Sequence, residues 1–388
     1  MFQLKKTTLC MALSLGILSA SQAAEPIKVG VALDISGPFA AIGVETRDGI
    51  ELAIEKLGGK LGGIDAEFLQ TDFAGNPQQA NQLANRFIQK DKIDFFTGPV
   101  ASNAALAVGP ALFAAKVPFL SSNPGPSQFA GKQCNPYFFG VYQNDTYDEA
   151  AGVLANEAGY KNAVIIAPNY PAGKDHLGGF KRTYKGEIKE EIYTKVGQID
   201  YAAEIARIRS EKPDAVYLFL PGAMGINFVK QFVGAGLKDI PLVAPGFSAD
   251  QDVIAAVGDA VENMQNTAHW AHDLDNAANK EFVQAFRDKY KRYPTVYAAQ
   301  SYDVVMAMDA AVRDVKGNVQ DREALVAALK NANFNSVRGE FKYGANNYPI
   351  QNYYVRKIGK NANGELTNIL VKTILPNHQD AYVAECKM

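Results

Sequence analysis

Short apolar runs rich in β-branched and aromatic residues recur along the chain, and each is followed by a segment whose apolar positions have helical spacing. The runs lie at residues 28–33, 94–97, 117–120, 163–167, 215–220 and 242–244. Continuous apolar strands that alternate with helices are typical of parallel sheets covered on both faces. The helix predicted at residues 44–57 agrees with this, because Ile50, Ala53 and Leu57 share one apolar face. The pattern therefore predicts an α/β fold.

Two such series follow one another, which predicts two lobes. The first ends near Phe139, and the second begins with a predicted helix at residues 146–158. Residues 123–144 are rich in Gly, Pro, Asn and Ser, which break regular structure and suit a crossover between lobes. The C-terminal third is mostly helical and then indicates antiparallel strands at residues 341–357 and 366–374. The chain is therefore expected to cross back at least once.

The N-terminus has the pattern of an export signal. Two lysines precede an apolar run at residues 9–18, and residues 19–24 supply the small side chains of a signal-peptidase site. The run is too short to span a bilayer, which argues against a membrane anchor. We expect residues 1–24 to be a cleaved signal peptide and the mature chain to be exported and soluble.

Composition agrees with an exported globular protein. Hydrophobic residues make up 47% of the chain and the net charge is -2, so the basic footprint that nucleic acids require is missing. Of the three cysteines, Cys10 lies in the signal, which leaves Cys134 and Cys386. Two thiols in an oxidising compartment predict a disulfide between them, and two separate buried thiols are the alternative.

The loops that follow the predicted strands share one chemistry. They span residues 34–43, 98–104, 121–127, 168–173, 220–225 and 245–250. Open parallel sheets bind ligands beyond the carboxyl ends of their strands, where these loops lie. The loops hold Gly, Pro, Ser, Asn and aromatic residues but few acids, bases or nucleophiles. This indicates a site that holds a small molecule by backbone amides, hydroxyls and apolar walls.

Three serines in these loops are candidates for ligand contact. Ser102 is predicted to N-cap a helix at residues 103–113, whose free N–H groups would hold a carboxylate. A plain cap is the alternative. Ser121 and Ser122 would place hydroxyls in the same crevice, or would simply form a turn.

No constellation of residues indicates an enzyme. Residues 246–250 lack the final glycine of a nucleophile elbow, and no GxGxxG or P-loop motif follows a predicted strand. His269 and His272 are three positions apart, but no cysteine or carboxylate motif completes a metal site. Residues 174–176, Lys-Asp-His, are expected to form the solvated first turn of a helix. The sequence predicts neither catalysis nor a cofactor nor a metal.

Four segments resemble the extracellular solute receptors of ABC importers, in the leucine/isoleucine/valine-binding group of type I periplasmic binding proteins. They are IKVGVALDISGPFAAIG at 27–43, TGPVASNAALAVGPALFAAKVPFLSS at 97–122, VGAGLKDIPLVAP at 233–245 and FRDKYKRYPTVYAAQSYDVVMAMDAAV at 286–312. The resemblance extends over essentially the whole mature chain. It implies two doubly wound parallel-sheet lobes joined by a three-crossover hinge, which close over a ligand.

The same resemblance implies the boundaries of the lobes, the compartment of the protein and its partners. Lobe 1 is expected in residues 25–143 and 271–347, and lobe 2 in residues 144–270 and 348–388. A monomer in the periplasm would deliver its ligand to the permease subunits of an ABC transporter at the inner membrane. A soluble ligand-sensing receptor is a more distant alternative.

Carried over by resemblance, Ser102 would contact the ligand carboxylate. The loop that begins Ser121-Ser122-Asn123 would supply further groups, and Tyr297 matches a cleft position. Amino-acid binders of this group also carry a glutamate after the strand at residues 242–244, which pairs with the ammonium, but no acid stands there. Burial of an unpaired ammonium costs several kcal/mol, so amino acids should bind poorly.

Two features bear on the ligand class. Asp145, at a crossover position, is the one acid that could replace the missing glutamate, and a branched-chain or other hydrophobic amino acid is therefore the alternative ligand. Apolar and aromatic residues otherwise occupy the predicted cleft loops and crossovers, namely Phe39, Ile42, Tyr170, Phe247 and Trp270. The segments GPSQFAGKQCNPYFF at 125–139, NYPAGKD at 169–175 and HWAHDLDNAANKEF at 269–282 resemble the receptors that bind aromatic carboxylates such as benzoate or cinnamate-type acids. Ring stacking and apolar burial would supply the affinity. Core packing is the alternative for Phe247 and Trp270.

Overall fold

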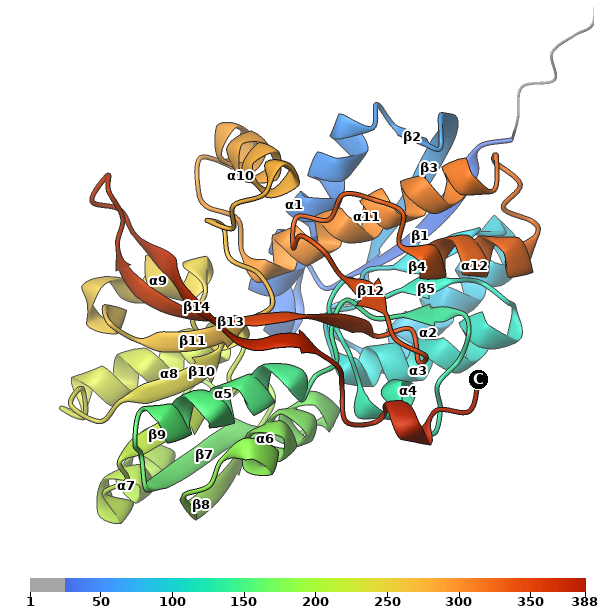
Figure 1. Ribbon diagram of the computed structural model, residues 1–388. Coiled ribbons are helices and arrows are strands. Elements are labelled where there is room, and N and C mark those ends of the chain that lie inside the picture. Colours follow the sequence, from blue (N-terminus) through green and yellow to red (C-terminus); the bar gives the residue numbers. More distant parts are fainter. Residues whose placement is uncertain (1–24) are drawn as a thin grey trace, which may run out of the picture.

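A computed structural model describes residues 25–388 of the chain (Figure 1). The expected signal peptide, with Cys10, lies outside the described residues. Among residues 25–388, no helix combines the length and the apolar character needed to cross a membrane.

The first sheet has six strands in the order β2-β3-β1-β4-β5-β6, all parallel except β2. Its strands are β1 (Ile27–Leu33), β2 (Lys60–Leu61), β3 (Ile64–Asp72), β4 (Phe95–Thr97), β5 (Phe119–Leu120) and β6 (Phe138–Phe139). The helices of this lobe are α1 (Ala40–Lys56), α2 (Pro77–Arg86), α3 (Ser102–Ala114), α4 (Ser127–Ala130), α10 (Ala277–Tyr290), α11 (Val296–Asp314) and α12 (Arg322–Asn331). Helix α1 packs on α11, and α2 packs on α3.

The second sheet runs β12-β13-β11-β10-β9-β7-β8, with β14 paired to β13. Its parallel strands are β7 (Asn162–Pro168), β8 (Glu187–Thr194), β9 (Ala215–Leu218), β10 (Leu242–Pro245) and β11 (Gln265–Ala268), and its antiparallel strands are β12 (Lys342–Tyr343), β13 (Pro349–Lys360) and β14 (Leu366–His378). The helices are α5 (Thr146–Glu157), α6 (Pro171–Thr183), α7 (Ala202–Glu211), α8 (Ala223–Gly234) and α9 (Gln251–Val257). The predicted pair of α/β lobes is confirmed.

Before β14, the chain passes between the lobes three times, between β6 and α5, between β11 and α10, and at the start of β13 (Figure 1). Arg338 binds two of these connections together, because its Nη1 donates to the Val141 carbonyl and to Gln351 Oε1, both at 2.9 Å. Its Nε donates to the Asp303 carboxylate at 2.8 Å. Both charged side chains are buried, so the pair is a fixed part of the hinge.

The C-terminal segment returns to the first lobe after β14. Cys134 and Cys386 form a disulfide with Cα atoms 5.5 Å apart, which confirms the predicted bond. Asp380 accepts a hydrogen bond from Asn346 Nδ2, and Gly131 lies close to Tyr382. The last residues were expected with lobe 2, but the disulfide holds them against α4 of lobe 1.

Candidate ligand-binding site

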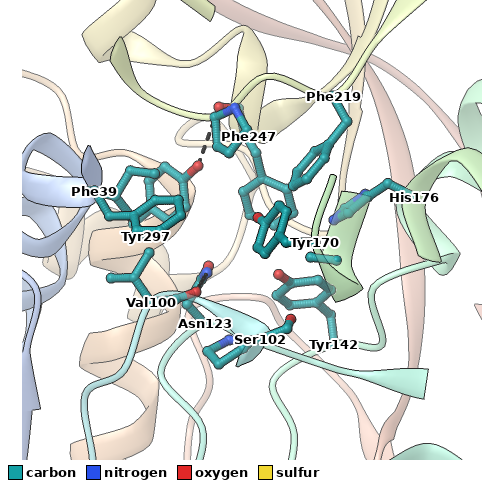
Figure 2. Close-up of a pocket in the computed structure, with 14 residues that line it drawn as sticks. Phe39, Val100, Ser102, Asn123, Tyr142, Tyr170, His176, Phe219, Phe247 and Tyr297 are labelled. Atoms are coloured by element: carbon teal, nitrogen blue, oxygen red, sulfur yellow. Dashed lines mark hydrogen bonds between the residues drawn. The ribbon is translucent and has the colours of Figure 1, made fainter. Parts of the chain in front are cut away.

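Loops from both lobes meet around one cavity (Figure 2). They follow β1, β4 and β5 in the first lobe and β7, β9 and β10 in the second. The lining side chains are Phe39, Ile42, Val100, Ser102, Asn123, Pro124 and Tyr297 from lobe 1, Tyr142 from the first crossover, and Tyr170, Ala172, His176, Phe219, Pro221 and Phe247 from lobe 2. The carboxyl ends of the parallel strands of the two sheets thus face one another across the cleft.

Half of the lining residues carry aromatic rings. Phe39 and Tyr170 come from opposite lobes and have ring centroids 6.1 Å apart. Phe247 and Tyr297 also face each other across the cleft at 5.3 Å, and the Tyr297 hydroxyl donates to the Phe247 carbonyl at 3.2 Å. These contacts between lobes describe a closed cleft whose walls suit a flat apolar group.

The N-terminus of α3 is the polar end of the cavity in lobe 1. Ser102 is the first residue of α3 and Ala101 is its cap, with no side-chain cap bond, which corrects the prediction that Ser102 is the N-cap. The Ser102 hydroxyl accepts from Asn144 Nδ2 at 3.1 Å. Among the described residues, the N–H groups of Ser102 and Asn103 have no protein acceptor. These groups and the helix dipole favour an anion here.

Asp34 holds the loop that leads into α3. Its Oδ2 accepts from the Val100 N–H at 2.7 Å, and its other oxygen is buried without a partner among the described residues. The loop also approaches β1 closely at Gly98, which has φ +113 and whose added Cβ would lie 2.3 Å from the Ala32 carbonyl oxygen. Glycine is therefore required at this position.

We expect Asp34 to make stability depend on pH. Burial raises the pKa of its carboxyl from 3.8 to about 7. Between these two pKa values, the native state keeps a proton that the unfolded chain has lost. The stability that this proton contributes is fully present below pH 3.8 and is lost as the pH rises to about 7. In Asp34→Asn, whose amide oxygen can still accept from Val100, the free energy of unfolding should fall less between about pH 5 and about pH 8 than in the unaltered protein. Urea denaturation at both pH values measures the free energy of unfolding. An equal fall in the variant and in the unaltered protein would contradict the prediction.

Seven of the eleven candidate residues line the cavity: Phe39, Ile42, Ser102, Asn123, Tyr170, Phe247 and Tyr297. The other four lie outside the lining. Ser121 donates to the Pro124 carbonyl at 2.6 Å, and the Ser122 hydroxyl is buried behind the wall. Asn123 is in the lining, but its side-chain amide has protein partners: Nδ2 donates to the Val100 carbonyl, and Oδ1 accepts from Gln300 Nε2.

Trp270 and Asp145 have structural partners instead. The Trp270 indole donates to Asn279 Oδ1 at 2.7 Å and packs on Phe282. Trp270 is therefore a core residue, which was the alternative interpretation of the sequence. The Asp145 carboxylate accepts from Arg182 Nη2 at 2.8 Å and from the Tyr382 hydroxyl at 2.7 Å. It is therefore engaged in an ion pair outside the cavity lining.

The wall of the cavity carries no fixed charge. Its lining contains no Asp, Glu, Lys or Arg. Burial lowers the pKa of His176, the one lining residue that ordinarily titrates near neutrality, to about 3, so this ring is neutral there. No described group of the wall can pair with an ammonium.

Sequence reasoning missed two residues at the start of α6. Asp175 and His176 were expected in a solvated turn, but the structure buries His176 and directs Asp175 across the cleft. Asp175 accepts from the Ser127 N–H at 3.0 Å and from its hydroxyl at 2.8 Å, which joins lobe 2 to α4 of lobe 1. Asn144 donates to both Asp175, at 2.9 Å, and Ser102. This network connects the closed lobes to the α3 end of the cavity.

Comparison with known proteins agrees with this geometry. Residues 26–364 match the family described as periplasmic binding protein. A solute-binding protein of an ABC transporter from R. palustris, solved in complex with benzoate, is 34% identical with a TM-score of 0.89, covering 94% of this chain and 100% of that one. Another, from Rhodopseudomonas palustris BisB5 with 3,4-dihydroxy benzoic acid, is 30% identical with a TM-score of 0.86 and covers 92% and 99%. The Leu/Ile/Val-binding protein homolog 6 of Brucella melitensis is 29% identical over 380 residues, 93% of this chain and 95% of its own. The chain therefore belongs to the periplasmic binding protein family.

Proposed function

We propose that this protein is the substrate-binding receptor of an ABC importer and that it takes up an aromatic carboxylate, of the benzoate or cinnamate type, between its lobes. The observation that carries the proposal is a cavity walled by aromatic rings, with a free helix N-terminus at one end and no acidic side chain in its lining. The closed receptor would deliver its ligand from the periplasm to the permease subunits.

An amino acid is the weaker candidate, although the Brucella relative is named for leucine, isoleucine and valine. Its ammonium would need an acidic partner in the cavity. Asp145 is held by Arg182 and Tyr382, and its release would leave the Arg182 charge without that partner. Unpaired burial of a charge costs several kcal/mol, enough to lower affinity by orders of magnitude. The benzoate and dihydroxybenzoate complexes of the two solved relatives support the aromatic acid.

Ser102 is proposed to bind the carboxylate together with the first N–H groups of α3. A hydrogen bond to a charged group contributes about 1.5–3 kcal/mol, so we expect Ser102→Ala to weaken binding of an aromatic acid by about ten- to a hundredfold. Its thermal stability should change little. Calorimetric titration measures the affinity, with Ser121→Ala as the matched control, because the Ser121 side chain does not line the cavity. Equal affinity of Ser102→Ala and the unaltered protein would remove Ser102 from the site.

A thermal-shift panel tests the ligand class directly. Leucine, isoleucine, valine and phenylalanine are compared with benzoate, phenylacetate, cinnamate and hydroxycinnamate on the mature protein. A ligand that binds the native state raises its melting temperature by mass action. We expect a rise with one or more aromatic acids and none with the amino acids. A rise with leucine or valine alone would refute the proposal.

A further inference from the structure

His176, a lining residue, has a fully buried side-chain atom whose hydrogen-bonding capacity the fold does not use. Among the cavity-lining side chains of residues 25–388, His176 Nε2 is the one fully buried nitrogen or oxygen without a hydrogen-bond partner. The side chain is 1% exposed. Figure 2 shows the imidazole extending from α6 toward the space between Phe219, Tyr170 and Tyr142. Buried polar atoms of native proteins are nearly always satisfied, so this one calls for a partner in the cavity.

The rest of the His176 ring is held in place. Its Nδ1 hydrogen bonds to the Asp148 carboxyl, whose other oxygen accepts from the Tyr217 hydroxyl. The ring is stacked on Phe219 with centroids 3.5 Å apart and planes 13° apart. Because one nitrogen is bound and one face is covered, Nε2 cannot turn away to find another partner. The partner must therefore come from the contents of the cavity.

The two polar ends of the cavity come from different lobes. Ser102 and the N-terminus of α3 belong to lobe 1 and suit a carboxylate, whereas His176 belongs to lobe 2. An aromatic acid without a second polar group would place ring C–H groups against Nε2 and leave this atom unpaired. A ring hydroxyl, in contrast, can both donate and accept, so it matches Nε2 whichever ring nitrogen carries the proton. A carboxylate only accepts, so it matches only the form protonated on Nε2.

We propose that His176 Nε2 binds a phenolic hydroxyl of the ligand, so that the preferred ligand is a hydroxylated aromatic acid rather than benzoate or cinnamate. This inference rests on the proposed function, since it assumes an aromatic acid in the cavity. A site built around a polar atom disfavours the analogue that leaves this atom unpaired. We expect at least one hydroxylated acid to bind about ten- to a hundredfold more tightly than its unsubstituted parent.

The test compares benzoate with 3-hydroxybenzoate and 4-hydroxybenzoate, and cinnamate with 4-hydroxycinnamate, by calorimetric titration. It uses the unaltered protein and two variants. His176→Asn keeps a polar atom near the Nδ1 position, where it can still reach Asp148, but lacks an atom at Nε2. His176→Gln places its amide near the Nε2 position. The hydroxyl preference should fall to about twofold or less in His176→Asn and be partly retained in His176→Gln.

Each outcome decides between the proposals. Tight binding of benzoate or cinnamate with no gain from any hydroxyl in the unaltered protein would overturn the role of His176 and leave the proposed function standing. A hydroxyl preference that persists undiminished in His176→Asn would also overturn it. Failure of every aromatic acid to bind would refute the proposed function and this inference together. Should His176→Asn not fold, the lack of any gain from a hydroxyl in the unaltered protein would still overturn the role of His176.

Discussion

Asp303→Ala is expected to lower the free energy of unfolding by about 3–5 kcal/mol, because it removes one partner of a buried ion pair. Asp303 accepts from Arg338 Nε at 2.8 Å, from the Ser336 hydroxyl at 2.5 Å and from the Val337 N–H at 3.0 Å. Its side chain is 1% exposed and that of Arg338 is 2% exposed. The substitution would leave the guanidinium charged and without its counter-ion in the hinge.

Urea denaturation measures this loss, and two further variants separate the charge from the packing. Asp303→Asn keeps an acceptor for the neighbouring N–H groups but not the charge, so most of the loss should remain. The double variant Asp303→Leu/Arg338→Met removes both charges and should recover part of the stability, since an apolar pair can replace a buried ion pair at little cost. A loss below about 1 kcal/mol in Asp303→Ala would mean that water reaches the guanidinium.

The buried strand β11 was missed because its sequence, QNTA, is mostly polar, whereas most strands that are both buried and apolar could be predicted. Such strands are continuous apolar runs, as in β7, where six of seven residues are buried. Strands β3 and β8 were missed, because they are largely half-exposed and carry charged residues in IDAEFLQTD and EIKEEIYT. Partial burial removes the apolar run on which the prediction depended.

The candidate site could be predicted as far as strand topology determines it. Loops after parallel strands meet at one edge of each sheet, and residues such as Phe39 and Tyr170 could be placed in the cleft from that rule alone. The rule cannot tell which residue of a loop faces the cavity. Ser121 and Ser122 therefore entered the prediction although they lie behind the wall, and Trp270 entered it as an aromatic residue on a predicted cleft loop or crossover.

Asp175 and His176 show what local sequence cannot reveal. Lys-Asp-His at the start of a helix has the appearance of a solvated turn, and nothing within a few residues indicates otherwise. Asp175 is half-buried, and Ser127 of the other lobe and Asn144 of the hinge both donate to it. His176 becomes buried only because Phe219 and Asp148 cover it. These environments depend on contacts between segments that are far apart in the sequence, and hydrophobic periodicity does not predict such contacts.

Loss of the disulfide is the second large effect that we expect. Cys134 and Cys386 are 252 positions apart, so their bond restricts a very long loop in the unfolded chain. Chain-entropy arguments and measured cases indicate that replacement of both cysteines by serine should lower the free energy of unfolding by about 2–4 kcal/mol. Neither cysteine lines the cavity, so affinity for an aromatic acid should stay within about twofold.

The single variants distinguish the bond from the packing of each sulfur. If the covalent link carries the effect, Cys134→Ser, Cys386→Ser and the double variant should lose the same free energy, because either substitution breaks the bond. Independent packing effects would instead add in the double variant. Equal stability of the oxidised and reduced unaltered protein would contradict the prediction. A loss of affinity in the double variant would assign the C-terminal segment a part in closure, since the Tyr382 hydroxyl binds Asp145 at the start of α5, beside the first crossover.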